Sequence, residues 1–377
     1  MPDPLLRVAF LPDFPEEQWP SMDMCAEMLL KQWHGDPSMR IDAQTRCPRF
    51  RRRFTRVPVL GSHSASRNAD RLYNRFITYP RLLRSLHSSY DFFHLCDQSY
   101  AHLLHSLPEG RVGVYCHDLD VLRCLLQPET EPRPRWFRAM MRSVRDGLVK
   151  AAVVFCSTEP LRQQVLAQGL ADEQSVRLAP YGVAGEFRPG TDPVDPQLLL
   201  HVGSCIPRKR IDVLLAVVAR VRQHRPGVRL LQIGGEWTEA QRKQLAELKL
   251  HDAVTQVRGI SRDELAAHYR RAALVLQPSD AEGFGLPVTE ALACGAPVLA
   301  SDLPTLKAVG GDAVTYAPVG DVDRWTACIM SHLADPQEAP ALASRLAQAS
   351  RYSWNQHART IADAYHELAA RRGTVRR

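Results

Sequence analysis

From residue 198 to residue 316, short apolar runs of strand length alternate with segments whose apolar residues recur at helical spacing. This alternation predicts a parallel sheet wound on both faces, because each helix returns the chain to the same edge of the sheet. Ligands of such sheets bind beyond the carboxyl ends of the strands. The expected strands are 198–202, 228–233, 254–257, 273–277, 297–300 and 313–316, and the expected helices are 211–224, 239–248, 262–272 and 286–294.

The first half of the chain shows the same pattern more weakly. The expected strands are 6–11, 92–95, 112–116 and 152–157, and the expected helical stretches are 22–29 and 133–149. A chain of 377 residues is long enough for two such domains, each with a core of its own. The fold class expected from the pattern is therefore α/β, with two doubly wound domains.

A short segment rich in proline separates the two halves. Arg188–Gln197 reads RPGTDPVDPQ, which is the composition of a linker. We therefore expect an N-terminal domain of residues 1–190 and a C-terminal domain of residues 191–353. The remaining residues, 354–377, are expected to form a helix that starts at Trp354.

Cysteine usage and hydropathy exclude several classes of protein. The nine cysteines are scattered and form no CxxC pair, so neither a zinc site nor a dithiol redox motif is indicated. No apolar run approaches the ~18 residues that span a bilayer. Met1–Leu11 lacks the basic start of a signal peptide. These features favour a soluble cytoplasmic protein.

The net charge of +7 is unevenly distributed. Between Arg40 and Arg84 there are twelve arginines and only two acidic residues, Asp42 and Asp70, so this segment carries +10 (12 − 2). One interpretation is a face that meets an anionic membrane surface, and the other is a solvated face whose arginines pair with acids elsewhere. The charge alone does not decide between them. No nucleic-acid-binding module, P-loop or Gly-x-Gly-x-x-Gly fingerprint accompanies it, so no nucleic acid partner is expected.

The stretch with the most chemistry is Gln277–Pro297, QPSDAEGFGLPVTEALACGAP. It combines the end of a strand, a loop with two glycines and the start of a helix near Leu286. A helix start presents free N–H groups and a partial positive charge, and glycine lets the backbone approach a ligand, so this turn suits a diphosphate. The carboxylates of Glu282 and Glu290 can each accept hydrogen bonds from neighbouring hydroxyls, as on a sugar or ribose ring.

The pattern E-G-F-G-L-P-x-x-E, followed by A-x-x-x-G-x-P-V, resembles the E-x7-E signature of retaining glycosyltransferases with the GT-B fold, family 4 above all (glycosyl transferases group 1). The resemblance covers the second half of the chain and, more weakly, the first half. It implies two Rossmann-like domains with an interdomain cleft, and a last helix that crosses back to the first domain. It also implies that Glu282 contacts the donor sugar, that Glu290 holds the ribose, and that the turn binds phosphate. The turn residues are Gly283, Phe284, Gly285 and Leu286.

A second match is Val202–Arg210, which reads VGSCIPRKR. The resemblance implies that Gly203 lets the loop pass close to the donor and that Lys209 neutralises the diphosphate leaving group. Ser204 stands where the family commonly has an arginine, and Arg208 is expected to replace that charge. The alternative is that 208–210 is a solvated basic turn.

The family holds the nucleotide base with backbone groups after the third strand of the second domain. Arg258, Gly259 and Ile260 occupy the matching positions. The alternative at this place is an ordinary turn between a strand and a helix.

The strand end Val114–Leu119, VYCHDL, contains the H-D-L that the family often has in its first domain. The resemblance implies that His117 contacts the donor sugar and helps to align the acceptor, although a lone histidine at a strand end is more often structural. Asp118 and Asp120 form a D-x-D triplet, which binds a divalent metal in the other glycosyltransferase fold. Because Lys209 and the helix start already serve the diphosphate, no metal and no cofactor are expected.

These observations lead to one expected function and two alternatives. We expect a retaining, metal-independent hexosyltransferase that uses a UDP- or GDP-linked donor and a glycan or lipid-linked acceptor, in polysaccharide or glycolipid synthesis. Glu282, His117 and Lys209 are its expected catalytic residues. The alternatives are a nucleotide-sugar epimerase of the same shape and a non-catalytic protein that binds sugar nucleotides. The set of Glu282, Glu290 and Lys209 argues against the non-catalytic protein.

Overall fold

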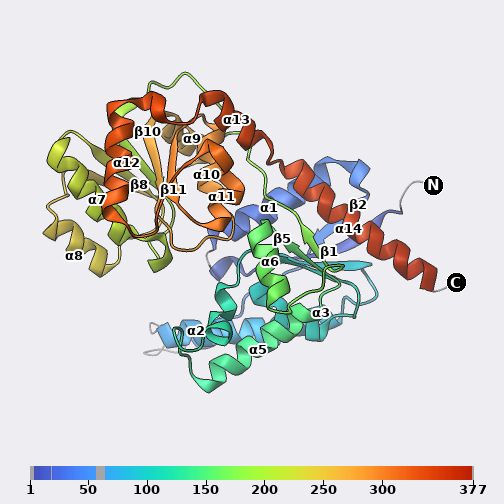
Figure 1. The fold of residues 1–377 in the computed structure, drawn as a ribbon. Helices are drawn as coiled ribbons and strands as arrows, with labels where there is room; N and C mark the ends of the chain where they lie inside the picture. The colour runs from blue at the N-terminus through green and yellow to red at the C-terminus, as the bar shows by residue number, and fades with distance from the viewer. Residues whose placement is uncertain (1–3, 18, 57–63, 376–377) are drawn as a thin grey trace. The chain divides into compact units, whose positions relative to one another are not determined.

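The structure, a computed structural model, describes residues 4–17, 19–56 and 64–375, which fall into two compact units (Figure 1). The first unit comprises Met1–Pro180 and Trp354–Arg377, and the second comprises Tyr181–Ser353. In the described residues each unit has one sheet of six parallel strands, ordered β2-β1-β3-β4-β5-β6 and β12-β11-β10-β7-β8-β9. In the first sheet the chain starts at β1, beside the edge strand β2, and in the second sheet it starts at β7, near the middle. In both sheets the later strands are added on both sides of the starting strand. The expected α/β fold with two doubly wound sheets is confirmed.

The first unit contains the elements that precede residue 180 and the last helix of the chain. Its strands are β1 (Leu6–Leu11), β2 (Ile41–Thr45), β3 (Phe92–Leu95), β4 (Val112–Cys116), β5 (Val153–Cys156) and β6 (Val176–Leu178). Its helices are α1 (Pro20–Gly35), α2 (Ser64–Tyr73), α3 (Tyr79–Arg84), α4 (Arg123–Leu126), α5 (Arg135–Val149), α6 (Glu159–Ala167) and α14 (Trp354–Val375), with a π-helical turn at Asn74–Thr78 and a 3-10 segment, η4, at Gln98–Ser106.

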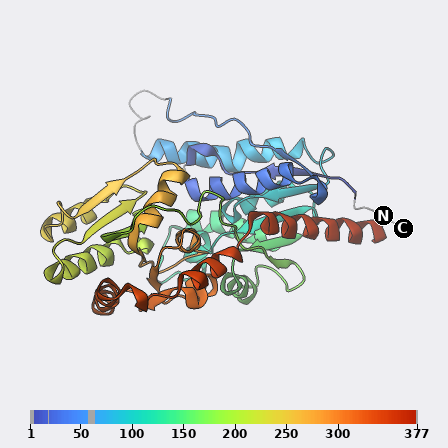
Figure 2. The same cartoon turned by 90° about the horizontal axis from the view of Figure 1, so that it is seen from above.

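Helices α1 and α14 cover one face of the first sheet and run side by side (Figure 2). Trp33 of α1 donates from Nε1 to the carbonyl of Ala358 in α14 at 3.1 Å. His94 of β3 meets the hydroxyl of Tyr365 of α14 at 2.9 Å, and both side chains are fully buried. These contacts join the C-terminal helix to the first unit, which is the return that the resemblance implies. Helix α5 and the 3-10 segment η4 pack on the opposite face.

The second unit has the regular alternation that the apolar pattern predicts. Its strands are β7 (Asp195–Val202), β8 (Arg229–Ile233), β9 (Val254–Val257), β10 (Ala272–Gln277), β11 (Val298–Ser301) and β12 (Thr315–Ala317). Its helices are α7 (Ile211–His224), α8 (Glu239–Glu247), α9 (Arg262–Arg271), α10 (Leu286–Ala293), α11 (Pro304–Gly310), α12 (Val322–Ala334) and α13 (Leu342–Ser350). Figure 1 shows α7, α8 and α12 on one side of the sheet and α10 and α11 on the other.

The segment between the two sheets is less of a linker than its prolines indicate. β7 already begins at Asp195, three residues before the predicted strand start, and Asp195 pairs with Arg229 at 2.6 Å. Upstream, Asp192 accepts from Nε of Arg270 at 2.5 Å, which ties the segment to α9 of the second unit. The two ion pairs and the pairing of Asp195 with Ala272 of β10 therefore outweigh the local preference of Pro193 and Pro196. The chain passes between units at Pro180–Tyr181, whereas the sequence predicts a boundary after residue 190.

None of the described helices is both long and apolar enough to cross a membrane.

Candidate functional site

The loop between β10 and α10 holds the first glutamate of the E-x7-E pattern. β10 ends at Gln277 and α10 begins at Leu286, so this loop lies at the carboxyl edge of the second sheet. Gly285 caps the helix with a φ of 101°, and a Cβ there would lie 2.7 Å from Cδ2 of Leu306. The positive φ favours glycine at this position, and a larger residue would also displace the side chain of Leu306. The helix N-terminus is thus fixed at Leu286, four residues after Glu282.

Glu282 is surrounded by hydrogen-bond donors. Its Oε1 accepts from Nζ of Lys209 at 2.5 Å, from Nε2 of Gln277 at 2.6 Å and from Oγ of Ser279 at 2.7 Å. Its Oε2 accepts from Nη1 of Arg208 at 3.1 Å. The structure therefore brings together three residues that the sequence singles out, Glu282, Lys209 and Arg208. It adds Gln277 and Ser279, which the sequence analysis did not identify.

Electrostatics keep Glu282 ionised although its side chain is only 6% exposed. Burial on its own would raise the pKa of this carboxyl group. The positive charges of Lys209 and Arg208 and the hydrogen bond from Ser279 outweigh burial and lower the pKa to about 2. At neutral pH the site consequently contains one buried carboxylate and two cations.

A short 3-10 turn, Pro207–Lys209, places the two cations. Arg210, which follows it, has a left-handed φ of 48° and starts α7. The carbonyl of Arg208 accepts from the backbone N–H of Asp280 at 2.9 Å, and Nη1 of Arg208 donates to the carbonyl of Ala281 at 3.0 Å. The loop after β7 and the loop after β10 are therefore tied together, so the cations keep their place beside Glu282.

Gly203 lies directly after β7, close to a glycine pair that the sequence analysis did not identify. Its carbonyl accepts from Nε2 of Gln232 at 2.8 Å. Gly234 and Gly235 follow β8, and a Cβ on Gly235 would lie 2.5 Å from the backbone nitrogen of Cys205. The sequence did contain a signal for this pair, because two adjacent glycines follow an apolar strand. Ligands of parallel sheets bind beyond that end of the strands.

Glu290, the second glutamate, lies in α10 and is 9% exposed. Its Oε2 accepts from the hydroxyl of Tyr269 in α9 at 2.9 Å. Burial raises the pKa of this carboxyl group to about 7, against the opposing effects of Tyr269 and Arg262. Glu282 and Glu290 thus share one loop and helix, but their pKa values move in opposite directions. Two cations bonded to Glu282 outweigh its burial, whereas Tyr269 and Arg262 do not outweigh the burial of Glu290.

The remaining predicted residues of this unit differ in how far they are exposed to a ligand. Gly259, after β9, is exposed with a φ of 69°, and the neighbouring Ile260 is half-buried. Phe284 is buried, with its ring edge-on to the rings of Tyr181 at 5.1 Å and Tyr352 at 5.4 Å. Its side chain is therefore part of the core, so any ligand contact at this position falls to its backbone. Gly283 and Leu286 are half-buried.

His117 lies directly after β4 in the first unit and is 6% exposed. Its Nε2 lies 2.7 Å from the carbonyl of Cys96, and its backbone N–H donates to Oε1 of Gln98. Burial lowers the pKa of the ring, while Asp97 and the Cys96 carbonyl act in the opposite direction. The imidazole is consequently neutral and held in place at the carboxyl edge of the first sheet.

In the D-x-D triplet, the side chain of Asp118 forms hydrogen bonds within the protein. Oδ1 of Asp118 accepts from the backbone N–H of Asp120 at 3.0 Å and from Nε2 of Gln98 at 3.3 Å. Within the described ranges, no group of three or more histidine, cysteine, aspartate or glutamate residues is arranged to hold a metal ion.

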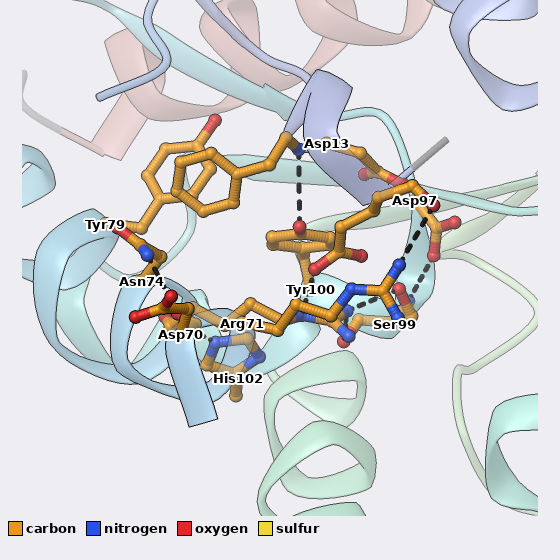
Figure 3. Close-up of polar contacts among 12 residues, drawn as sticks. Asp13, Asp70, Arg71, Asn74, Tyr79, Asp97, Ser99, Tyr100 and His102 are labelled. Atoms are coloured by element: carbon orange, nitrogen blue, oxygen red, sulfur yellow. Dashed lines mark hydrogen bonds and ion pairs between the residues drawn. The ribbon is translucent and has the colours of Figure 1, made fainter. Parts of the chain in front are cut away.

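A buried polar cluster at the carboxyl edge of the first sheet also escaped the sequence analysis (Figure 3). Asp13 follows β1, Asp97 follows the neighbouring β3, and both are less than a tenth exposed. Arg75 lies 3.8 Å from Glu17 and stacks on the ring of Tyr100 at 4.0 Å. Burial raises the pKa of Asp13 well above its usual range, and the negative charges of Asp97 and Glu17 add to this effect while Arg75 opposes it. Acidic residues directly after two predicted strands were the available signal.

The basic segment is mostly exposed. Of its twelve arginines, all within the described residues, nine are exposed, and Arg46, Arg71 and Arg75 are half-buried. Residues 57–63 of this segment lie outside the described residues. Carboxylate and amide side chains hold the main chain near its centre, since Asp70 accepts from the backbone N–H groups of Arg53, Phe54 and Thr55.

Residues 185–352 match the protein family described as Glycosyl transferases group 1. Over 221 residues, 54% of the chain, the sequence is 37% identical to D-inositol 3-phosphate glycosyltransferase of Segniliparus rotundus and covers 49% of that protein. Over 267 residues, 67% of the chain, it is 28% identical to O-antigen chain mannosyltransferase B of Escherichia coli and covers 69% of that protein. The chain spans about half the length of the inositol-phosphate relatives that it matches.

Solved structures match nearly the whole chain. Sucrose-phosphate synthase of Thermosynechococcus elongatus has a TM-score of 0.73 at 22% identity, with 97% of this chain and 99% of that chain covered. HepE of Anabaena in complex with UDP and glucose has a TM-score of 0.69 at 15% identity, with 92% and 95% covered. The two sheets and the returning C-terminal helix thus form the GT-B fold. Within that fold class, the chain is a homologue of glycosyltransferases.

Proposed function

We propose that this protein is a retaining hexosyltransferase that moves a hexose from a UDP- or GDP-linked donor to an acceptor hydroxyl without a metal ion. The observation that carries the proposal is the buried cluster of Glu282, Lys209 and Arg208 beside the N-terminus of α10. A diphosphate needs cations and free N–H groups, and a sugar ring needs a fixed carboxylate. The loop after β7 and the loop after β10 together offer all of them.

Each residue of the cluster has a proposed part in donor binding. Lys209, Arg208 and the helix start would hold the diphosphate, and Glu282 would accept hydrogen bonds from the sugar. Glu290 would hold the ribose, with Gly203, Gly259 and Ile260 along the nucleotide. The phosphates would contact the backbone of the turn, which consists of Gly283, Phe284, Gly285 and Leu286. His117 of the first domain would accept from a sugar hydroxyl as a neutral imidazole, because its Nε2–H donates to the carbonyl of Cys96.

The proposed reaction keeps the configuration at the anomeric carbon. The bond from the anomeric carbon to the diphosphate oxygen breaks while the acceptor oxygen bonds on the same face, and the acceptor proton passes to the departing oxygen. Lys209 and the N–H groups at the start of α10 stabilise the negative charge that develops on the leaving group. Glu282 is engaged by three donors at Oε1, which suits positioning of the sugar rather than covalent attack.

The names of the relatives support the proposed classes of donor and acceptor. Complexes of HepE contain UDP and glucose, which supports a UDP-hexose. An inositol phosphate glycosyltransferase and an O-antigen mannosyltransferase support a polar or glycan acceptor. We include a lipid-linked acceptor at the inner face of the cytoplasmic membrane, with the exposed arginines of Arg40–Arg84 meeting anionic lipids.

A thermal-shift screen against UDP- and GDP-hexoses tests donor binding, because a ligand that binds the folded state raises the melting temperature by mass action. Product analysis with the stabilising donor then separates the activities. A glycoside with retained configuration supports the proposal, an epimerised sugar nucleotide indicates an epimerase, and unchanged donor indicates a binding protein.

A further inference from the structure

Behind Glu282 lies a second layer of polar side chains that are buried more deeply than Glu282 itself. Gln277 is the last residue of β10 and Ser279 lies two residues later, and both are fully buried. Nε2 of Gln277 donates to Oε1 of Glu282 at 2.6 Å and to Oγ of Ser279 at 3.2 Å. Oγ of Ser279 donates to the same Oε1 at 2.7 Å. The two side chains therefore form one chain of donors that ends on Glu282.

The chemistry of this network fixes its direction. The amide of Gln277 places both N–H groups on acceptors, whereas the flipped amide would bring its oxygen to a carboxylate oxygen. Two acceptors without a proton between them repel each other, so only the observed orientation is stable. Burial removes water as an alternative partner, so these hydrogen bonds hold the carboxylate more firmly than they would at the surface.

The two oxygens of Glu282 are used unequally. Among the described residues, Oε1 receives three hydrogen bonds and Oε2 receives one, from Arg208. A carboxylate oxygen has about two lone-pair directions. Oε1 is therefore saturated, and the capacity to accept a further hydroxyl lies at Oε2.

We infer that Gln277 and Ser279 are positioning residues for the donor sugar. They hold Oε1 so that Oε2 of Glu282 faces the sugar hydroxyl. This inference rests on the proposed function, and it assigns to two residues a role in sugar recognition that acts only through Glu282. Neither residue touches the substrate.

The test measures the share of affinity that the sugar adds to the nucleotide. UDP, UDP-glucose, GDP and GDP-mannose are titrated calorimetrically into the wild-type protein and into Ser279→Ala, Gln277→Met and Glu282→Gln. We expect each of the first two substitutions to lower the affinity advantage of nucleotide sugar over nucleotide, and kcat, by a factor on the order of 10, the usual value of a hydrogen bond to a charged group. The affinity for the nucleotide alone should change by less than about twofold, because the phosphate-binding cations remain.

A double-mutant cycle separates positioning from a general structural effect. Ser279→Ala should have almost no further effect on sugar affinity in a Glu282→Gln background, because the residue acts through the carboxylate. Ser301→Ala is the matched control, since Ser301 is a fully buried serine at the end of the neighbouring β11 whose Oγ bonds to none of the described residues. This control should keep the sugar advantage and kcat of the wild type.

The outcomes distinguish this inference from the proposed function. If no nucleotide sugar binds the wild type, or if Glu282→Gln keeps the full sugar advantage, the proposed function fails and the inference with it. If Glu282→Gln loses the sugar advantage but Ser279→Ala and Gln277→Met keep it, only the inference fails. Equal losses from Ser279→Ala with and without Glu282→Gln also overturn it, because they show a role independent of Glu282.

Discussion

Nζ of Lys209 and Oε1 of Glu282 lie 2.5 Å apart, so the cation proposed for the diphosphate and the carboxylate proposed for the sugar are bonded to each other. Arg208 pairs with the same carboxylate at 3.1 Å. A diphosphate that binds here meets two cations that are already paired with Glu282. Its binding free energy is therefore reduced, because it must share both cations with this carboxylate.

The first prediction follows from this pairing. Glu282→Gln should tighten the binding of UDP or GDP by about 1 kcal/mol or more, because two close cations lose their internal counter-charge. The same change should abolish most of the transfer activity, since the amide cannot replace the carboxylate at the sugar. Calorimetric titration with the nucleotide and a transfer assay measure the two effects. Weaker nucleotide binding, or transfer at the wild-type rate, would contradict the prediction.

The second prediction concerns pH and Glu290. The pKa of this buried carboxyl group is raised from its usual value of 4.5 to about 7 in the folded protein. The folded state thus binds the proton more tightly, so the stability from Glu290 is fully present below about pH 4.5 and is lost as the pH rises through about 7. Glu290→Gln should remove up to about 3 kcal/mol of this pH dependence. Melting temperatures of both proteins from pH 5 to pH 8 provide the check, and parallel curves would show that the shift is absent.

A third prediction concerns the nucleotide at the same residue. Glu290→Ala should weaken nucleotide binding by about 1–3 kcal/mol, the loss expected for hydrogen bonds to a charged group. In the wild type, affinity should rise from pH 6 to pH 8 as the carboxylate ionises and accepts from the ribose. Titrations at these two pH values measure both effects. An affinity that is independent of pH and of the substitution would remove Glu290 from the nucleotide site.

The regular alternation of the second half allowed most of the second unit to be predicted. α7 and β9 have the expected bounds, and a capping box of Ser261 and Glu264 starts α9. In the first unit β1, β3 and β4 also have the expected bounds. Their apolar runs are buried on both faces, which leaves an unambiguous signal in the sequence.

Other elements could not be predicted because their signal lies in tertiary contacts. β2 contains only two apolar residues, Ile41 and Ala43, and it forms because β1 pairs with it. The roles of Gln277 and Ser279 depend on where Glu282 lies in space, and no spacing in the sequence shows this. The effect of Asp97 on the pKa of Asp13 is of the same kind, since 84 residues separate them in the sequence (97 − 13).

The fourth prediction concerns metal. Transfer activity should survive an excess of chelator. Lys209, Arg208 and the start of α10 supply the positive charge that a metal ion would otherwise provide at the diphosphate. Asp120→Asn should leave the rate unchanged, because the side chain of Asp120 is not needed for the proposed site. Loss of activity with chelator and its recovery with manganese would instead point to Asp118 and Asp120.

The fifth prediction concerns the exposed arginines of the first unit. The protein should sediment with anionic liposomes and be released as salt rises, because each arginine near an anionic surface contributes about 1 kcal/mol within a Debye length of roughly 8 Å. Replacing Arg51, Arg52 and Arg53 by serine should weaken this binding. The melting temperature should change little, because Asp70 and Asn74 bond to the backbone N–H groups of Arg53 and Arg51, which the serine variant keeps.

A matched variant controls for net charge. Arg225, Arg242 and Arg351 are exposed arginines of the second unit, and their replacement by serine removes the same charge elsewhere. This variant should bind anionic liposomes like the wild type. Equal sedimentation with neutral and anionic lipids, or none with either, would leave a water-soluble acceptor as the remaining interpretation.

The central claim, that the Lys209–Glu282 cluster binds a nucleotide sugar, is tested most directly by calorimetric titration of UDP- and GDP-hexoses into the wild type and Lys209→Met. The account predicts that at least one of these donors binds the wild type, and that Lys209→Met binds it at least about tenfold more weakly because a buried cation at the diphosphate is lost. If every donor fails to bind the wild type, or if the same donor binds both proteins equally well, the account is contradicted.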